Sequence, residues 1–578
     1  MLKIIKMKKN KLYLSTGLII FLIFTNCSDF LETEPKSFWT DDNFYSNKQE
    51  VDLAVNGIYS QLANDALYGW NFNVRLEAGT DESYTNDTGA NWAESKYDHT
   101  AASNPIKNVW LNFYRSIQLA NQLEKNIKPE IFSSEQEYKS VLAKAYFMRA
   151  FCYFNLANWF GSVPLRLKPT EDQNDNNLAP SPTFDVYSQV EKDLLYAAEN
   201  LLNISDANYL KGEPNKMAAH GMLARLYLKM GGYQPYLSPN DANCYFDNRT
   251  QYFDKAKQQC ETVMNSGLFQ LTPAAGTNPY REHFLSYLQD RYDITESLFE
   301  ISFGNFELLG IRAAGRLGNI NGVEFSGALD IPRGFCKINA SIPLYNIYGT
   351  NDLRREWNIA GFKNRFSITT LTTNMSYIFN SPLNQEYGPG KFRRWEPTDI
   401  DALKAAGTLQ NADYTILNNT PGSETDPNFT SINFPILRYA DILLMHAEAI
   451  IGGKDGAASA DGNAVNSLNQ VRLRAGLDPY TGSVSHDDFF NELVDERMRE
   501  LCFEGLRKQD LIRWNLLEEK LLETNQTIIN FPSYNPANQF HNTYTEPGRN
   551  FDKTKHLLLP YPAQETQLNS KLNQRTGW

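Results

Sequence analysis

The stretch VLAKAYFMRAFCYFNLANW, residues 141–159, decides the fold class of this chain. Its apolar side chains recur every three to four positions, which is the period of an amphipathic helix. Small side chains stand at Ala143, Ala145 and Ala150, at the spacing of positions that contact a neighbouring helix. Because small contact residues let two helix axes approach closely, the stretch predicts a helix packed among other helices.

The same period recurs along much of the chain. The other periodic segments are 51–62, 109–123, 186–202, 217–230, 253–264, 440–451, 464–473 and 490–506. Stacked helical hairpins of roughly 34 residues are the unit of tetratricopeptide arrays. We therefore predict a mainly α fold with a tetratricopeptide-like frame of helical hairpins.

Two long segments between these helices have a different character. Residues 71–104 are polar, aromatic and rich in turn residues, and residues 272–430 contain short β-like pieces such as SLFEISF and YIFN. Long connections without helical pattern are often functional, and binding residues are common on loops that a rigid scaffold holds. We expect these irregular and short β excursions to carry a binding face.

The N-terminal residues have the pattern of a secretory leader. Five lysines precede the apolar run 12–24, and its about 13 residues fall short of the roughly 20 that a membrane-spanning helix needs. The run ends close to Cys27, as in bacterial lipoproteins, where the cysteine carries lipid and becomes the first residue. We expect residues 1–26 to be the leader and Cys27 to be the lipid attachment site. An ordinary signal peptide cut near Cys27 is the alternative, because residues 24–26 (Phe-Thr-Asn) depart from the usual lipoprotein box.

Composition excludes several classes of function. The chain has 55 Lys and Arg against 67 Asp and Glu, a net charge of −12, whereas nucleic-acid binding needs basic patches. Its six cysteines include no C-x-x-C pair, which argues against a metal ribbon or a full disulfide framework. Cys152 and Cys502 stand in apolar helical patterns and are expected to be packed as small hydrophobic residues.

No motif of enzyme chemistry is found. Nucleophile-elbow, zinc-protease, P-loop and dinucleotide-binding patterns are missing, and we expect neither catalysis nor a metal or cofactor. His220 and His446 fall on apolar helical faces, where hydrogen-bonded core histidines are expected. The helical spacing of Glu496 and Glu500 would also suit a catalytic carboxylate pair.

Structural ion pairs are the favoured interpretation of that acidic segment. Arg497 precedes Glu500 by three positions, and Glu504 precedes Arg507 and Lys508 by three and four, spacings that place opposite charges side by side on a helix. Other charges in apolar helices are expected to pair across helices; they are Arg438, Asp441 and Glu448.

Nine strings in order along the chain resemble the SusD/RagB family of outer-membrane lipoproteins of Bacteroidetes. Among them are CSDFLETEP (27–35), AKAYFMRAFCYFNLANWFGSVPL (143–165), FPILRYADILLMHAEAI (434–450), DERMRELCFEGLRKQDLIRW (495–514) and LLLPYPAQETQLNSKLNQRTGW (557–578). Arg575 and Thr576 stand where the family often has an asparagine. The resemblance implies an N-terminal region, 27–270, that includes the loop 71–104. It also implies a C-terminal region, 271–578, with the loop-rich insert 272–430, helices in 434–520 and a tail.

The resemblance also implies a function. Such a protein binds oligosaccharides without cutting them and delivers them to a SusC-like TonB-dependent transporter. A lipid anchor would hold it on the outer membrane, facing outward. Oligopeptide binding by the same architecture stays open, and a surface glycan hydrolase or a ligand-free helical scaffold are further alternatives.

Stacking of sugar rings on aromatic side chains, with hydrogen bonds from polar neighbours, defines the candidate site. Two regions supply the candidates, 75–97 and the segment after SLFEISF. The expected ligand-binding residues are Asp81, Tyr84, Asn86, Asn91, Trp92, Tyr97, Phe306, Arg316, Asn319 and Phe325.

Overall fold

A computed structural model describes most of the chain. The described residues are 44–235, 244–273, 278–304, 307–308, 311–312, 314–326, 332–379, 387–418 and 427–578. Cys27 and Phe306 lie outside them.

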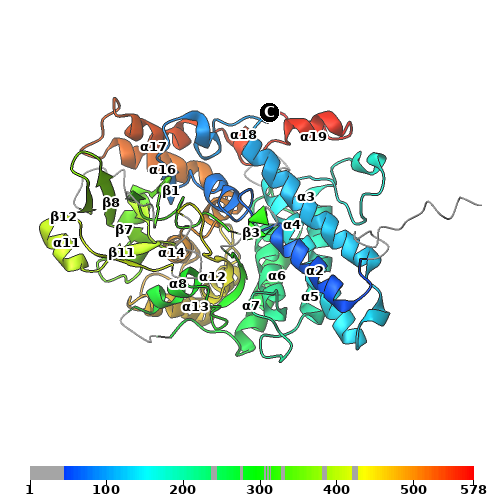
Figure 1. Cartoon of the computed structure of the whole chain (residues 1–578). Helices are drawn as coiled ribbons and strands as arrows, with labels where there is room; N and C mark the ends of the chain where they lie inside the picture. The colour runs from blue at the N-terminus through cyan, green and yellow to red at the C-terminus, as the bar shows by residue number, and fades with distance from the viewer. Residues whose placement is uncertain are drawn as a thin grey trace, which may run out of the picture.

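An array of antiparallel helices forms one end of the molecule (Figure 1). From α3 to α7, each helix packs against the next one along the chain, and α2 packs against α3 and α4. The helices of this array are α2 (Lys48–Ser60), α3 (Asn104–Asn126), α4 (Glu135–Phe160), α5 (Thr183–Asn200), α6 (Lys216–Gly231) and α7 (Arg249–Asn265). Ala143, Ala145 and Ala150 of α4 are fully buried, so the predicted helix contacts are confirmed.

Capping side chains fix where these helices begin. The side chains of Asn47, Ser103, Ser134 and Asn215 each accept a hydrogen bond from a backbone N–H in the first turn of the helix that follows. Such a cap contributes about 1 kcal/mol relative to alanine.

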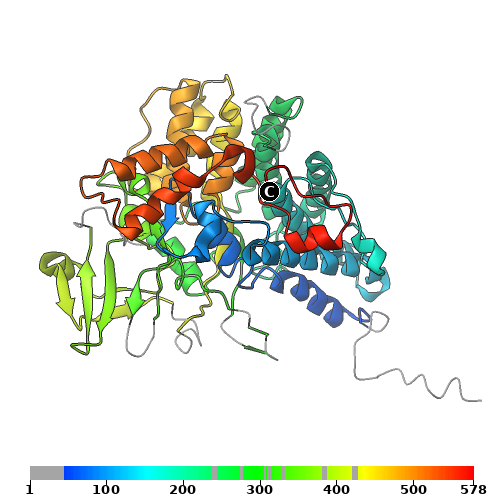
Figure 2. The ribbon, with the colours of Figure 1, turned by 90° about the horizontal axis from the view of Figure 1, so that it is seen from above.

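Helix α12, from the C-terminal half, continues the array. It packs against α6, α7, α13 and α14. The later helices are α12 (Tyr439–Ile451), α13 (Gly462–Arg474), α14 (His486–Leu501), α15 (Arg507–Arg513), α16 (Leu517–Ile529), α17 (Gln539–Asn550), α18 (Lys553–His556) and α19 (Ala563–Leu568). Figure 2 shows the C-terminal helices, orange to red, running from the strand-rich end to the array. The division of the chain at residue 270 stays a prediction.

Short strands and helices fill the predicted insert and the segment 71–104. One sheet has four strands, in the order β12-β9-β8-β5, and every other sheet of the described residues has two. The strands are β1 (Ser83–Thr85), β2 (Ser297–Ile301), β3 (Glu307–Leu308), β4 (Ile311–Arg312), β5 (Phe325–Ser326), β6 (Ile338–Ala340), β7 (Ile359–Ala360), β8 (Phe362–Ser367), β9 (Thr372–Tyr377), β10 (Gly388–Pro389), β11 (Trp395–Pro397), β12 (Thr408–Gln410), β13 (Tyr414–Ile416) and β14 (Phe434–Arg438). The short helices are η1 (Asn71–Leu76), η2 (Ala90–Lys96), η3 (Pro129–Ile131), η4 (Gln173–Asn176), α8 (Pro279–Leu288), α9 (Ile342–Asn346), α10 (Arg355–Asn358) and α11 (Ile400–Ala406). The predicted fold class, mainly α with helical hairpins and short β excursions, is confirmed.

The helix predicted over 490–506 ends early. Helix α14 stops at Leu501, Phe503 has a left-handed φ of 63°, and α15 begins at Arg507. The pairs expected within one helix do not form. Glu504 instead pairs with Arg438 and Lys391, because the break turns it toward other elements.

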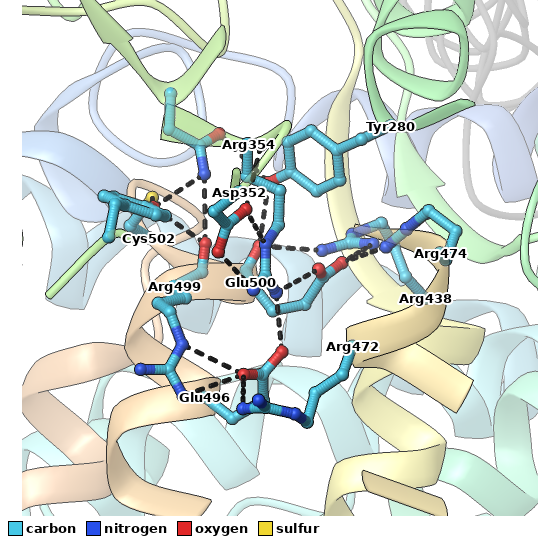
Figure 3. Close-up of polar contacts among 12 residues, drawn as sticks. Tyr280, Asp352, Arg354, Arg438, Arg472, Arg474, Glu496, Arg499, Glu500 and Cys502 are labelled. Carbon is cyan, nitrogen blue, oxygen red and sulfur yellow. Dashed lines mark hydrogen bonds and ion pairs between the residues drawn. The ribbon is translucent and has the colours of Figure 1, made fainter. Parts of the chain in front are cut away.

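A buried network of ion pairs around Glu500 joins several elements of the C-terminal half of the chain (Figure 3). Arg438, at the end of β14, donates to Glu500 at 3.0 Å, and Arg354 reaches the other Glu500 oxygen at 3.1 Å. Arg474 of α13 also donates to Glu500. Burial alone would raise the pKa of Glu500, but these three arginines hold it at about 2. Glu496, also fully buried, is bound by Arg354 and Arg499.

The sequence interpretation of the other buried groups is confirmed. Asp441 pairs with Arg225 and Arg497, and Glu448 with Arg513. Glu496 and Glu500 are therefore structural. A hydrogen bond to Gln259 holds His220, and a hydrogen bond to Ser467 holds His446. Cys152 and Cys502 are fully buried.

Candidate ligand-binding surface

The segment 75–97 lies mainly inside the protein, not on a surface loop. Strand β1 pairs antiparallel with β6 and carries the segment into the interior. Four of its six predicted contacts are at most 4 % exposed: Asp81, Tyr84, Trp92 and Tyr97. The side chains of these four are covered by the protein itself, and their role as ligand contacts stays a prediction.

Each of three buried side chains has a structural partner instead. Arg507 holds Asp81 through two hydrogen bonds of 2.9 and 2.6 Å. The Tyr84 ring lies 4.0 Å from that of Tyr544, and the Tyr97 hydroxyl donates to the carbonyl of Gly79 at 2.8 Å.

The remaining candidates divide between interior and surface. Asn319 and Phe325 are buried, and Phe325 packs edge-on against the rings of Trp395 and Tyr414; as ligand contacts both stay predictions. Asn86 is half-buried and donates to the carbonyl of Cys336 at 2.6 Å, and Asn91 is exposed. Asn86 and Asn91 stay predictions.

Trp92 belongs to a pair of tilted rings that reaches the surface. Its ring lies 5.8 Å from that of Trp70, and the Arg75 guanidinium lies 5.6 Å from each of the two rings. Glu94 fixes Arg75 through a 2.9 Å ion pair. Trp70 is only half-buried, so Trp92 supports a platform that Trp70 presents.

Arg316 lies beside this pair of rings, as part of a second group. Its guanidinium is 3.0 Å from Asp65 and 4.9 Å from the centre of the Phe429 ring. Asp65 and Arg316 are 40 % and 31 % exposed. We call these six residues the aromatic–arginine surface: Asp65, Trp70, Arg75, Trp92, Arg316 and Phe429.

Backbone contacts lock the two groups together. The Arg316 N–H donates to the Gly69 carbonyl at 2.8 Å, and Gly315 forms a bridge with Thr430. A Cβ at Gly315 would lie 3.0 Å from the Phe303 ring and 3.3 Å from the Gly69 Cα, so this close approach favours glycine. Segments distant in the sequence therefore meet at a fixed geometry.

Asp65 supplies the carboxylate, a hydrogen-bond acceptor, of the aromatic–arginine surface. Burial raises its pKa, while Arg316 and a hydrogen bond from Trp70 partly offset the shift. Its Oδ1 atom has no hydrogen-bond partner among the described residues. The surface thus combines an indole face, oriented guanidinium groups and a carboxylate, of which the Oδ1 atom is buried.

Sequence reasoning missed Asp65, Trp70 and Phe429. The Gly-Trp pair at 69–70 was the available signal for Trp70, but it lies just before the 75–97 window. Asn319, predicted as a contact, instead supports the rim of the surface: its side-chain amide donates to the carbonyls of Arg333 and Pro427.

Two family models match the chain. The model described as "SusD family" matches residues 337–578, and the model described as "Starch-binding associating with outer membrane" matches residues 29–228. The chain belongs to the SusD family. Within the described residues, no helix is both long enough and apolar enough to span a membrane.

Similar proteins cover nearly the whole of this SusD-family chain. SusD-like protein P2 of Formosa agariphila is 24 % identical over 98 % of this chain and 99 % of its own length. A SusD homologue from Bacteroides thetaiotaomicron has a similar structure, with a TM-score of 0.75 and 23 % identity over 93 % of this chain and 98 % of its own. A laminarin-binding SusD-like protein has a TM-score of 0.64 and 21 % identity, over 92 % of this chain and 100 % of its own.

Proposed function

We propose that this protein binds oligosaccharides at the cell surface through the aromatic–arginine surface, without cutting them. The observation that carries the proposal is the half-buried Trp70 ring, set between Arg75 and Asp65 and packed at a tilt against Trp92. A pyranose ring has apolar C–H faces that lie well on an indole, while its hydroxyls bind guanidinium and carboxylate groups. The structure supplies both kinds of contact in one place.

The comparisons support carbohydrate as the ligand class. One matching family model is described as starch-binding, and one protein of similar structure as laminarin-binding. Both descriptions concern other proteins.

A binding role without catalysis agrees with the placement of the carboxylates. Glycoside hydrolysis ordinarily uses two carboxyl groups that flank the bond to be cut. Glu496 and Glu500, the pair in the sequence with suitable spacing, are fully buried and bound by arginines. Asp65 of the surface is paired with Arg316.

Replacing Trp70 with alanine tests the proposal. We expect binding to weaken by about 1–3 kcal/mol, by analogy with the stacking of nucleobases on aromatic side chains. Affinity gels containing laminarin or starch, and fluorescence titration with their fragments, measure the change. Reducing-end assays on the same mixtures should detect no new ends.

Trp578→Ala is the matched control, because Trp578 is also half-buried with a cation, Lys555, 4.4 Å from its ring. Its sugar affinity should equal that of the unmodified chain. Equal affinity of the Trp70→Ala variant would remove this surface from the site. Release of reducing ends would support a hydrolase, and binding of peptides but no sugar would support the oligopeptide alternative.

We further propose that lipid on Cys27 holds the protein on the outer membrane, where it delivers its ligand to a SusC-like TonB-dependent transporter. Replacing Cys27 with alanine should move the protein from the membrane pellet to the soluble fraction, because two or more acyl chains are needed for stable anchoring. Cell fractionation with detection of the protein measures this. Ser28→Ala, at the next position, should leave the protein in the pellet, and an unchanged distribution of the Cys27 variant would reject the anchor.

A further inference from the structure

A hollow lies along α3, apart from the aromatic–arginine surface. Its volume is about 860 Å³, and its walls come from α3, the loop over 164–176 and the C-terminal helix α19. Ligand pockets in proteins commonly measure about 300–1,000 Å³. We call this hollow the α3 groove.

A tyrosine held in a fixed orientation lies in the groove. The Tyr114 hydroxyl donates to the Pro164 carbonyl at 2.8 Å. Trp110 lies 4.9 Å away, ring centre to ring centre, and the Arg166 guanidinium lies 5.8 Å from the Tyr114 ring. Tyr114 is half-buried, so part of its surface is open to the groove while its orientation is set by the protein.

Polar groups surround this ring. The side-chain oxygen of Gln118 accepts from the Thr170 N–H at 3.0 Å, which orients its amide. Arg115 is exposed, and Arg166 has a buried Nε atom with no acceptor among the described residues. Burial raises the pKa of Glu565, with partial offset from a Trp110 hydrogen bond and from Arg166.

The groove borders the aromatic–arginine surface through one short turn. Gln61 lines the groove, and Asp65 of the surface follows four residues later. Fully extended chain spans at most about 3.6 Å per residue, so the two Cα atoms lie within about 14 Å of each other. Asn64 stiffens the turn, since its side chain bonds the Gln61 carbonyl and the N–H groups of Ala66 and Leu67.

We propose that the α3 groove binds the continuation of an oligosaccharide whose first rings occupy the aromatic–arginine surface. The inference rests on the proposed function and extends it: the preferred ligand is a long chain rather than a short fragment. An amide, guanidinium groups and one carboxylate around a tyrosine ring suit hydroxyls, which both donate and accept hydrogen bonds. They suit a chain of sugar rings better than an apolar partner.

A series of laminari- and malto-oligosaccharides, from the disaccharide to the octasaccharide, tests this on the full chain. Affinity should keep rising with length for the unmodified protein. The double variant Arg115→Ala/Gln118→Ala should lose about tenfold in affinity for the longest members, as expected for two lost hydrogen bonds. Its affinity for the shortest members should not change.

Asn104→Ala/Lys107→Ala is the matched control, because it removes an amide and a cation three positions apart on the same helix but outside the groove. This control should behave as the unmodified chain at every length. The inference is overturned if affinity stops rising with oligosaccharide length, or if the groove variant binds the longest members as tightly as the unmodified chain. In either case, binding of short fragments leaves the proposed function intact. Absence of binding at every length overturns both.

Discussion

Replacing Arg438 with methionine is expected to lower the free energy of unfolding by about 3–5 kcal/mol, the usual cost of removing one partner of a buried ion pair. Arg438 is 1 % exposed. It donates to Glu504 at 2.8 and 2.7 Å, to Glu296 at 2.8 Å and to Glu500 at 3.0 Å. The variant leaves these buried carboxylates short of a counter-charge. Urea unfolding followed by circular dichroism measures the loss.

Arg365→Met is the control, since it removes an equally well-formed pair at the surface. Arg365 binds Glu324 at 2.6 and 2.8 Å, but its side chain is 49 % exposed, and exposed pairs contribute about 0–1 kcal/mol. Equal losses from the two variants would show that the buried network does not stabilise the fold as argued. If the Arg438 variant does not fold at all, Arg354→Met gives a second measurement on the same network.

The helical frame could be predicted because its signals are local. The apolar period over 141–159 falls within α4, and Ser134 and Gly161 mark its two ends through a side-chain cap and a positive φ. The segment 490–506 shows the limit of this approach. Its apolar period continues past Leu501, while the break at Phe503 accompanies contacts of Glu504 with residues far away in the chain.

The candidate site was only partly predictable, because an aromatic residue in a polar segment looks the same whether it is exposed or buried. Tyr84 and Tyr97 are covered by helices near the C-terminus, and Asp81 is bound by Arg507, 426 positions away. No local sequence pattern indicates such distant partners. Arg316 and Trp92 both belong to the aromatic–arginine surface, but Trp92 is buried beneath it; their roles as ligand contacts stay predictions.

Lys229 differs from the network charges, because no described residue accepts a hydrogen bond from its ammonium group. It lines a cavity of about 60 Å³ together with Glu77 and Gln509. Burial, with a smaller contribution from Arg513, lowers the pKa of Lys229 to about 7. A lysine whose pKa falls on folding opposes folding fully at and below its folded pKa, and the opposition declines as the pH rises toward its unfolded pKa.

Replacing Lys229 with methionine should therefore stabilise the protein, in contrast to the Arg438 variant. The gain should be full at and below pH 7, at most about 4–5 kcal/mol at 1.36 kcal/mol per pKa unit. It should shrink as the pH rises from about 7 and vanish near the ordinary lysine pKa of 10.5, because the unfolded chain then also loses its proton. Urea unfolding at several pH values measures the change.

Lys391→Met is the control: Lys391 is equally buried but donates to Glu504 at 2.7 Å, so its replacement should destabilise the fold. A Lys229 variant that loses stability at pH 7 would show that the ammonium group is satisfied in the folded protein.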